Sequence, residues 1–191
     1  SLISELYPRS SEGEITIECN PDDVTEAYAE GLASLPINRV SMGVQSFDAD
    51  DLTFLNRRHS AQQVHSAIRA LRQCGITNLS LDLIYGLPRQ TEEKWRANIK
   101  EFLSLGVPHL SAYHLIYEEG TALTRLVERG KVKPVDEEAS LLFFQILIDE
   151  LRAAGYEHYE ISNFALPGLH ARHNTGYWQG VPYLGFGPSA H

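Results

Sequence analysis

The segment from Asn78 to Pro88 constrains the fold of this chain more than any other. Apolar and polar side chains alternate from Leu79 to Tyr85, which is the period of a β-strand with one buried face. Asp82 lies in mid-strand between leucines, and an ionised carboxylate is costly to bury unless something binds it. Helix-like segments precede and follow this strand, as in a βα unit, where ligand groups collect at the carboxyl ends of the strands. Asp82 therefore either binds a ligand or merely bonds to neighbouring backbone.

The same alternation predicts further strands over 14–20, 39–46 and 109–116, and a fifth over 157–164. Capping residues and helical spacing predict helices from Asp22 or Asp23 to about Ser34, over 48–57, from Ser60 to Gly75, after Thr91, over 122–129 and from Asp136 to Gly155. Strands that alternate with helices indicate an α/β fold with a parallel sheet, which is either a barrel or an open sheet.

The faces of the strands decide between these two folds. Glu18, Gln45 and Asp82 share a face with other polar or small side chains, and the opposite faces are apolar. A doubly wound open sheet is buried on both faces and reads as near-continuous apolar runs. We therefore expect a barrel with a polar, ligand-filled interior and outer helices. Glu18, Gln45 and Asp82 would then lie at comparable heights near the carboxyl rim.

Composition limits the class of protein. The 16 basic and 25 acidic residues give a formal net charge of −9, which argues against a nucleic-acid partner. No apolar run approaches the length of a membrane span. Cys19 and Cys74 are far apart and lack metal-ligand spacing, so we expect no metal held by this chain's cysteines and a cytoplasmic location. The first residues contain neither a starting Met nor a signal peptide, which suggests the interior of a longer protein.

Several charged side chains suit a binding site and also have local explanations. Arg57 or Arg58, at the end of a predicted helix, could reach over the rim and hold a carboxylate bidentately. Cations are also favoured at helix C-termini for local reasons. His59 and His114 could bind metal or move protons, although a lone His is more often structural. An unrelated barrel hydrolase with His114 and Asp82 on a metal is a further alternative.

The segment from Pro167 onward is predicted to be a loop rich in glycine and aromatic residues. It contains His173-Asn-Thr-Gly-Tyr-Trp178 and ends in Tyr183-Leu-Gly-Phe-Gly-Pro-Ser-Ala-His191. This loop either folds over the mouth of the barrel or is held by Tyr177 and Trp178 as hydrophobic anchors.

Five motifs occur in order along the chain: Ile17-Glu-Cys-Asn-Pro21, Ser41-Met-Gly-Val-Gln-Ser-Phe47, Leu55-Asn-Arg-Arg-His59, Asp82-Leu-Ile-Tyr-Gly-Leu-Pro88 and His173-Asn-Thr-Gly-Tyr-Trp178. Together they resemble the radical S-adenosylmethionine (SAM) family of oxygen-independent coproporphyrinogen III oxidases. The resemblance covers nearly the whole chain and is closer to the haem-chaperone branch of that family. Each motif is modest alone, but the ordered set is specific.

The resemblance implies a partial TIM-like (β/α) barrel over 1–165 that holds SAM beside a [4Fe–4S] cluster. The family's SAM-binding positions fall on Glu18, Gln45, Arg57 and Asp82. Arg57, rather than Arg58, matches the arginine that pairs with the methionine carboxylate. Oxygen acceptors and a guanidinium donor suit the hydroxyl, ammonium and carboxylate groups of SAM. The resemblance places region 166–191 on the substrate or haem side, with His173, Asn174, Tyr177 and Trp178.

Two parts of the family pattern do not occur in this sequence. The CxxxCxxC cluster loop and a glycine-rich SAM-binding strand are expected before Ser1, and a C-terminal domain is expected after His191. Without cluster thiolates no electron reaches SAM to form the deoxyadenosyl radical. We therefore expect this chain alone to be catalytically inactive and at best a weak SAM binder. A barrel without its first strands also has open edges, which favour self-association.

Two functions stay open at this point. An oxidase would use the deoxyadenosyl radical to abstract a hydrogen from a propionate of coproporphyrinogen III, release carbon dioxide and leave a vinyl group. A haem chaperone would keep the cluster and SAM and transfer haem to an acceptor protein. The motifs at 55–59 and 173–178 favour the haem-chaperone branch.

Overall fold

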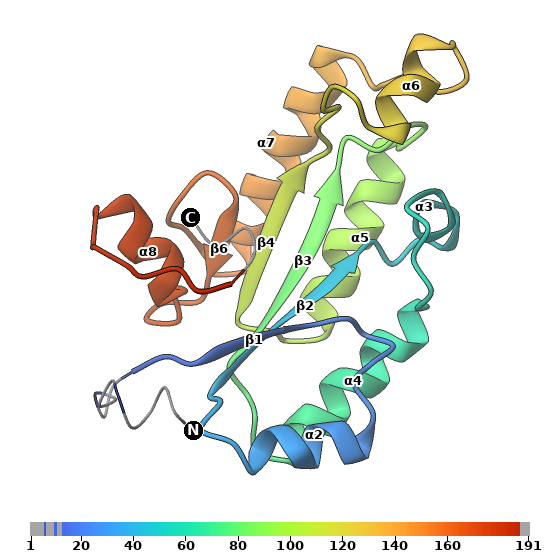
Figure 1. Cartoon of the computed structure of the whole chain (residues 1–191). Coiled ribbons are helices and arrows are strands. Elements are labelled where there is room, and N and C mark those ends of the chain that lie inside the picture. The colour runs from blue at the N-terminus through green and yellow to red at the C-terminus, as the bar shows by residue number, and fades with distance from the viewer. Residues whose placement is uncertain (1–5, 7–9, 11–12, 188–191) are drawn as a thin grey trace.

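Four parallel strands form the larger part of the sheet in the computed structural model, which describes residues 6, 10 and 13–187 (Figure 1). They are β1 (Thr16–Cys19), β2 (Arg39–Gln45), β3 (Leu79–Tyr85) and β4 (His109–His114). Two short antiparallel strands, β6 (Asn163–Ala165) and β5 (Glu157–His158), extend the sheet beyond β4. The strand order is β1-β2-β3-β4-β6-β5. Within the described residues the two edge strands, β1 and β5, do not pair with each other, so the barrel is partial.

Helices connect the parallel strands. The described helices are α2 (Glu26–Ala33), α3 (Ala49–Phe54), α4 (Ala61–Gln73), α5 (Glu92–Ser104), α6 (Ala122–Glu128), α7 (Glu137–Ala153) and α8 (Arg172–Trp178). The predicted caps Ser60 and Thr91 are confirmed, and Ser60 forms a capping box with Gln63. The helices predicted to start at about Asp48 and at Asp136 are capped by these two aspartates.

The predicted cap of α2 is wrong. Thr25, and not Asp22 or Asp23, caps this helix, because the Thr25 hydroxyl accepts a hydrogen bond from the Tyr28 N–H at 3.1 Å. Asp22 instead forms an ion pair with Arg58, with the two charged groups 2.8 Å apart. The helix therefore starts after a turn in which the Asp23 N–H donates to the Asn20 carbonyl oxygen.

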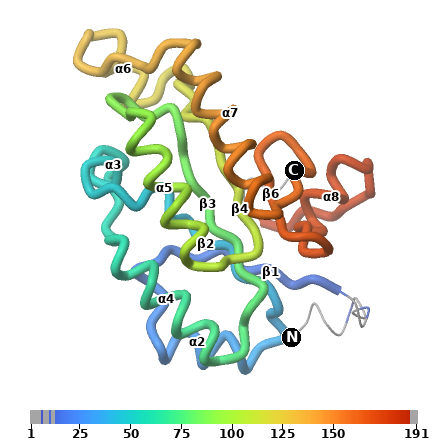
Figure 2. The backbone as a smooth tube through the Cα atoms, turned by 180° about the vertical axis from the view of Figure 1, so that it is seen from behind, coloured from blue at the N-terminus to red at the C-terminus, as the bar shows by residue number. Residues whose placement is uncertain are grey.

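The apolar core lies between the outer face of the sheet and helices α4, α5 and α7 (Figure 2). Six side chains of β2 and β3 on this face are fully buried: Val40, Met42, Val44, Leu79, Leu81 and Leu83. They pack against apolar residues of the helices, including Leu71, Trp95 and Leu147. The predicted apolar outer faces are therefore confirmed, and the alternate, mostly polar side chains point to the inner face.

The single strand predicted over 157–164 is wrong. The chain forms β5, reverses direction and returns as β6, antiparallel to both neighbours. The Glu160 carboxylate accepts hydrogen bonds from the Ser162 N–H and from the Asn163 side chain. These bonds close the reversal between the two strands, so a run that alternates in sequence becomes a short hairpin.

The segment after Pro167 is not only a loop, because it contains α8. The Ala171 N–H at its start donates a hydrogen bond to the Tyr159 hydroxyl, so this helix is tied to the turn between β5 and β6. The last part of the predicted Gly-rich segment, 188–191, lies outside the described residues. Across residues 6, 10 and 13–187, no helix combines the length and apolar character needed to span a membrane.

Candidate functional site

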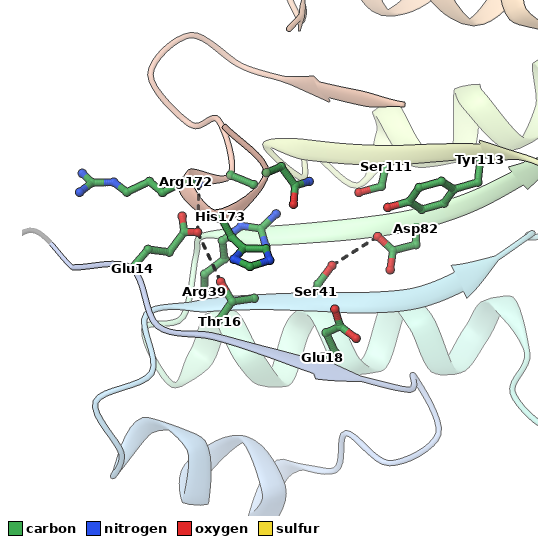
Figure 3. Close-up of a pocket in the computed structure, with 12 residues that line it drawn as sticks. Glu14, Thr16, Glu18, Arg39, Ser41, Asp82, Ser111, Tyr113, Arg172 and His173 are labelled. Carbon is green, nitrogen blue, oxygen red and sulfur yellow. Dashed lines mark hydrogen bonds between the residues drawn. The ribbon is translucent and has the colours of Figure 1, made fainter. Parts of the chain in front are cut away.

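A cavity of about 650 Å³ opens on the inner face of the sheet (Figure 3). It is lined by Glu14, Thr16, Glu18, Arg39, Ser41, Asp82, Ser111, Tyr113, Ala171, Arg172, His173 and Asn174. Paired residues of parallel strands point to the same side of a sheet. The register of Glu18 with Ser41, and of Asp82 with Ser111, therefore gathers polar side chains from four neighbouring strands.

Asp82 is the most strongly perturbed acid in this cavity. Burial raises the pKa of its carboxyl from the ordinary value of 3.8 to about 6, and hydrogen bonds from Ser111 and Ser41 offset only part of that effect. The Ser41 hydroxyl donates to Asp82 Oδ1 at 3.3 Å. The negative charge of Glu18 in the same cavity raises the pKa further. Asp82 and Glu18 are thus two of the three acidic side chains in this cavity, with Glu14, that can accept hydrogen bonds from a ligand or attract its positive charge.

A buried hydrogen-bonded chain forms one wall behind the cavity. His109 Nδ1 lies 2.7 Å from the Ser80 hydroxyl, and His109 Nε2 lies 2.7 Å from the Tyr159 hydroxyl. Because Tyr159 accepts from the Ala171 N–H, its own proton is free to point to His109 Nε2. Burial, with the nearby charge of Arg39, lowers the pKa of His109 to about 3. The imidazole is therefore neutral and fixes α8 against β4.

The sequence and fold can now be compared with known proteins. Residues 2–102 match the model of the Radical SAM superfamily. The chain belongs to this superfamily.

Relatives within the radical SAM superfamily support the predicted haem-chaperone branch. The chain is 37% identical to heme chaperone HemW of Lactococcus lactis over 93% of its length and 37% identical to HemW of Bacillus subtilis over 97%. A mitochondrial radical S-adenosyl methionine domain-containing protein 1 of Danio rerio is 35% identical over 93% of the chain. These alignments cover 47%, 49% and 40% of the relatives, so the chain spans about half the length of the curated relatives it matches.

A solved structure confirms the predicted fold. Coproporphyrinogen III oxidase (HemN) from Escherichia coli superposes with a TM-score of 0.76 at 27% identity. The superposition covers 94% of this chain and 41% of the oxidase chain. The partial radical SAM barrel is therefore the fold of this chain, with parallel strands and outer helices as expected.

The structure brings together some of the predicted SAM-site residues. Glu18 and Asp82 both line the cavity, whereas Gln45 and Arg57 are not among its lining residues. Gln45 has a φ of 68° and follows a shift in register after Met42. Its Nε2 atom lies 3.0 Å from the position that a Cβ at Gly43 would occupy. Gln45 is thus the last residue of β2 and follows the irregularity in that strand, and Arg57 is exposed to solvent after α3.

The cavity also extends further from the carboxyl rim than the sequence indicated. Asp82 is the fourth of seven residues in β3, and Arg39 is the first residue of β2. Arg39, Ser111 and Tyr113 were not predicted as site residues. Arg39 and Ser41 are two residues apart in β2 and therefore point to the same face of the sheet. The alternation alone could have identified Arg39 as a residue of the inner face.

The structure excludes the metal-hydrolase alternative. His114 Nε2 lies 3.0 Å from the Ser140 hydroxyl of α7, on the outer face of the sheet, whereas Asp82 faces the cavity. His59 is buried, and its Nε2 lies 2.9 Å from the Val44 carbonyl oxygen. Both imidazoles therefore have structural partners outside the cavity.

The predicted haem-side residues line a second cavity of about 400 Å³ beside the first. Both cavities share Tyr113, His173 and Asn174 as lining residues. Tyr177 and Trp178 line the second cavity and are 51% and 64% exposed, so they are not buried anchors. Both rings are partly exposed at this cavity, where Tyr177 also contacts the rings of His173 and Tyr183.

The described residues fit SAM better than they fit the cluster. Glu18 and Asp82 offer oxygen acceptors in the cavity, which suit hydroxyl and ammonium groups. Cys19 is on the outer face of β1 among the core residues, and Cys74 follows α4. Within the described part of the chain, no thiol therefore faces the cavity, and cluster ligation by these two cysteines does not fit.

Proposed function

We propose that this chain is the SAM-binding core of a cytoplasmic haem chaperone, which binds haem and passes it to an acceptor protein. The observation that carries the proposal is 34–38% identity to bacterial proteins named heme chaperone, over 93% or more of the chain. The net charge of −9 is consistent with a tetrapyrrole or protein partner and not with nucleic acid.

The proposed SAM site consists of Glu18, Gln45, Arg57 and Asp82, with SAM beside a [4Fe–4S] cluster. When bound, these cofactors would supply one-electron chemistry. We expect Glu18→Gln and Asp82→Asn to weaken SAM binding by the native gene product about tenfold or more, as measured by calorimetry. Glu30→Gln, an exposed acid on α2, is the matched control and should leave the affinity unchanged. If all three variants bind SAM as tightly as the wild type, this site is refuted.

The proposed haem side consists of region 166–191, as a unit distinct from the barrel of 1–165. His173 could ligate haem iron, and Tyr177 and Trp178 could stack on the macrocycle. His173 and Tyr177 have ring centroids 5.1 Å apart in an edge-on arrangement. A histidine and exposed aromatic rings beside one cavity are the combination that a flat, iron-containing ligand requires.

Oxidative decarboxylation of coproporphyrinogen III is the second candidate function. Structural similarity to the Escherichia coli oxidase, with a TM-score of 0.76, favours it. The same SAM-binding residues would serve either function, so these residues do not discriminate between them. We expect the chain alone to be inactive in this reaction, because Cys19 and Cys74 face away from the cavity.

One experiment tests both functions. The native gene product is reconstituted anaerobically with iron and sulfide and given SAM, a reductant and coproporphyrinogen III, and products are measured by mass spectrometry. Loss of two carbon dioxides, abolished by Asp82→Ala or Arg57→Ala, would establish the oxidase and refute the chaperone. Intact porphyrinogen with SAM cleavage would refute the oxidase.

Haem binding is tested on the same preparation by absorption spectroscopy. We expect a shifted Soret band that His173→Ala changes. His65→Ala is the matched control, because this half-buried histidine pairs with Glu101 far from the cavities, with 2.6 Å between Nε2 and Oε1. Absence of haem binding would refute the chaperone.

A further inference from the structure

Arg39 is a buried charge without a counter-charge in contact. The residue is 5% exposed, and its Nε atom is buried without a hydrogen-bond partner. Among the described residues, no carboxylate lies within 4.0 Å of its guanidinium, although Glu14, Glu18 and Asp82 line the same cavity. A buried ionised group normally finds a partner, because leaving it unpaired has a large desolvation cost. The described part of the protein therefore gives this arginine no partner, and a ligand in the cavity could supply one.

The neighbours of Arg39 leave the guanidinium available to a ligand. His109 is neutral, and both of its ring nitrogens already have partners in Ser80 and Tyr159. Thr16 is the register partner of Arg39 on β1 and presents a short hydroxyl side chain to the same cavity. Figure 3 shows Arg39 within the cavity, on the side of His173. His109 and Thr16 are thus neutral neighbours of Arg39, whereas the acids Glu14, Glu18 and Asp82 of the same cavity form no ion pair with its guanidinium.

The two cavities connect this cation to the proposed haem side. Tyr113, His173 and Asn174 line both cavities. A macrocycle beside Tyr177 and Trp178 could therefore extend a flexible acidic side chain past His173 toward Arg39. A guanidinium fork matches a carboxylate in geometry and charge, and Arg is favoured over Lys for such bidentate contacts.

We propose that Arg39 is the anchor for a propionate carboxylate of the bound tetrapyrrole. The proposal rests on the proposed function, because it assigns a contact to the same ligand. It is distinct from the SAM site, whose carboxylate is assigned to Arg57. The propionate accepts hydrogen bonds from the guanidinium, for which the protein supplies no acceptor among the described residues. This contact also orients the macrocycle relative to His173.

The test compares haem with its dimethyl ester, in which both propionates are uncharged. Affinities of the native gene product are measured by absorption titration for the wild type, Arg39→Gln, Arg39→Lys and the control Arg129→Gln, an exposed residue after α6. We expect the wild type and the control to bind haem about tenfold more tightly than the ester. Arg39→Gln should bind both ligands equally, and Arg39→Lys should retain part of the preference. The Soret band should keep its position in all variants.

Two results would overturn the proposal: a wild type that binds haem and ester equally, or an Arg39→Gln variant that keeps the preference. If Arg39→Gln does not fold, Arg39→Lys and the two ligands still decide the question. Absence of binding for both ligands would refute the haem-chaperone function instead. Arg39 is then probed by titration with sodium propionate, followed by NMR of the arginine Nε–Hε signal that Arg39→Lys removes. A shift of that signal supports the carboxylate site, and its absence refutes it.

Discussion

Asp82 lies in the middle of β3, where Ser41 and Ser111 donate hydrogen bonds to its carboxylate. Burial raises its pKa to about 6, whereas an aspartate in an unfolded chain titrates near 3.9. Between these values the folded state binds more protons than the unfolded state, so this group makes stability fall as pH rises through that window. A carboxylate kept at such a cost is typical of a ligand-binding position.

Asp82→Asn should therefore stabilise the protein at about pH 7.5 by about 2 kcal/mol and have little effect at about pH 4, where the wild-type carboxyl is already protonated. Urea unfolding of both proteins at the two pH values measures the difference. A stability difference that is the same at both values would contradict the raised pKa.

At the scale of single residues, alternation was sufficient to predict which way Glu18 and Asp82 point, because the period of a strand follows from backbone geometry. Alternation did not predict that Arg39 is buried without a partner. A charged side chain at the first position of a strand is usually exposed. Arg39 is buried here because β4 and the start of α8 lie beside it, and both are distant in sequence. A pattern in the sequence around Arg39 therefore could not predict its burial.

The end of β2 is held by α5. Asn98 is buried, and its Oδ1 accepts hydrogen bonds from the Phe47 N–H at 2.6 Å and the Ser46 hydroxyl at 3.1 Å. Its Nδ2 donates to the Lys94 carbonyl oxygen within the helix. These bonds fix the backbone immediately after Gln45, whose φ of 68° is uncommon for a residue other than glycine.

Asn98→Ala should leave the partly buried Phe47 N–H without its partner, cost about 1–3 kcal/mol of stability and weaken SAM binding through Gln45. The control is Asp136→Ala, which removes the N-cap of α7 at a cost of about 1 kcal/mol without contacting β2. Urea unfolding and SAM titration are measured on both variants. If the two variants lose SAM affinity equally, Asn98 has no positioning role.

Gly86 ends β3 at a position where a side chain has no room. Its φ is +76°, and an added Cβ would lie 2.5 Å from His114 Nε2. Gly75 has a similar φ of +83° but no atom within 4 Å of an added Cβ. We expect Gly75→Ala to cost about 1–2 kcal/mol from backbone strain alone and Gly86→Ala about 1–3 kcal/mol more from overpacking. Denaturant unfolding compares the two variants, and equal costs would show that His114 moves aside freely.

At the scale of elements, long amphipathic helices such as α4 and α5 were predictable because their capping and apolar spacing are local. The short helix α8 was not, because it has no side-chain cap and contains Gly176. Helices this short are unstable in isolation and depend on tertiary contacts. The contact from Ala171 to Tyr159 is of this kind, and the reversal between β5 and β6 likewise depends on pairing with β4.

At the scale of the whole molecule, the free edge of β1 is the feature that bears on self-association. The Arg39 N–H donates to the Ile15 carbonyl oxygen, so in a parallel ladder the backbone groups of Thr16 and Glu18 point away from β2. Within the described residues no other strand pairs with that side of β1. An unpaired strand edge is a template for pairing with another chain.

The 191-residue chain should therefore self-associate as its concentration rises, with β1 at the contact. Thr16→Pro removes an outward N–H without removing a bond to β2, so it should suppress association. Thr16→Ala shortens the same side chain, keeps the N–H and should associate like the wild type. Sedimentation velocity over a wide range of concentrations measures all three proteins. A wild type that remains monomeric throughout, or a Thr16→Pro variant that associates equally, would show that the β1 edge is not the contact.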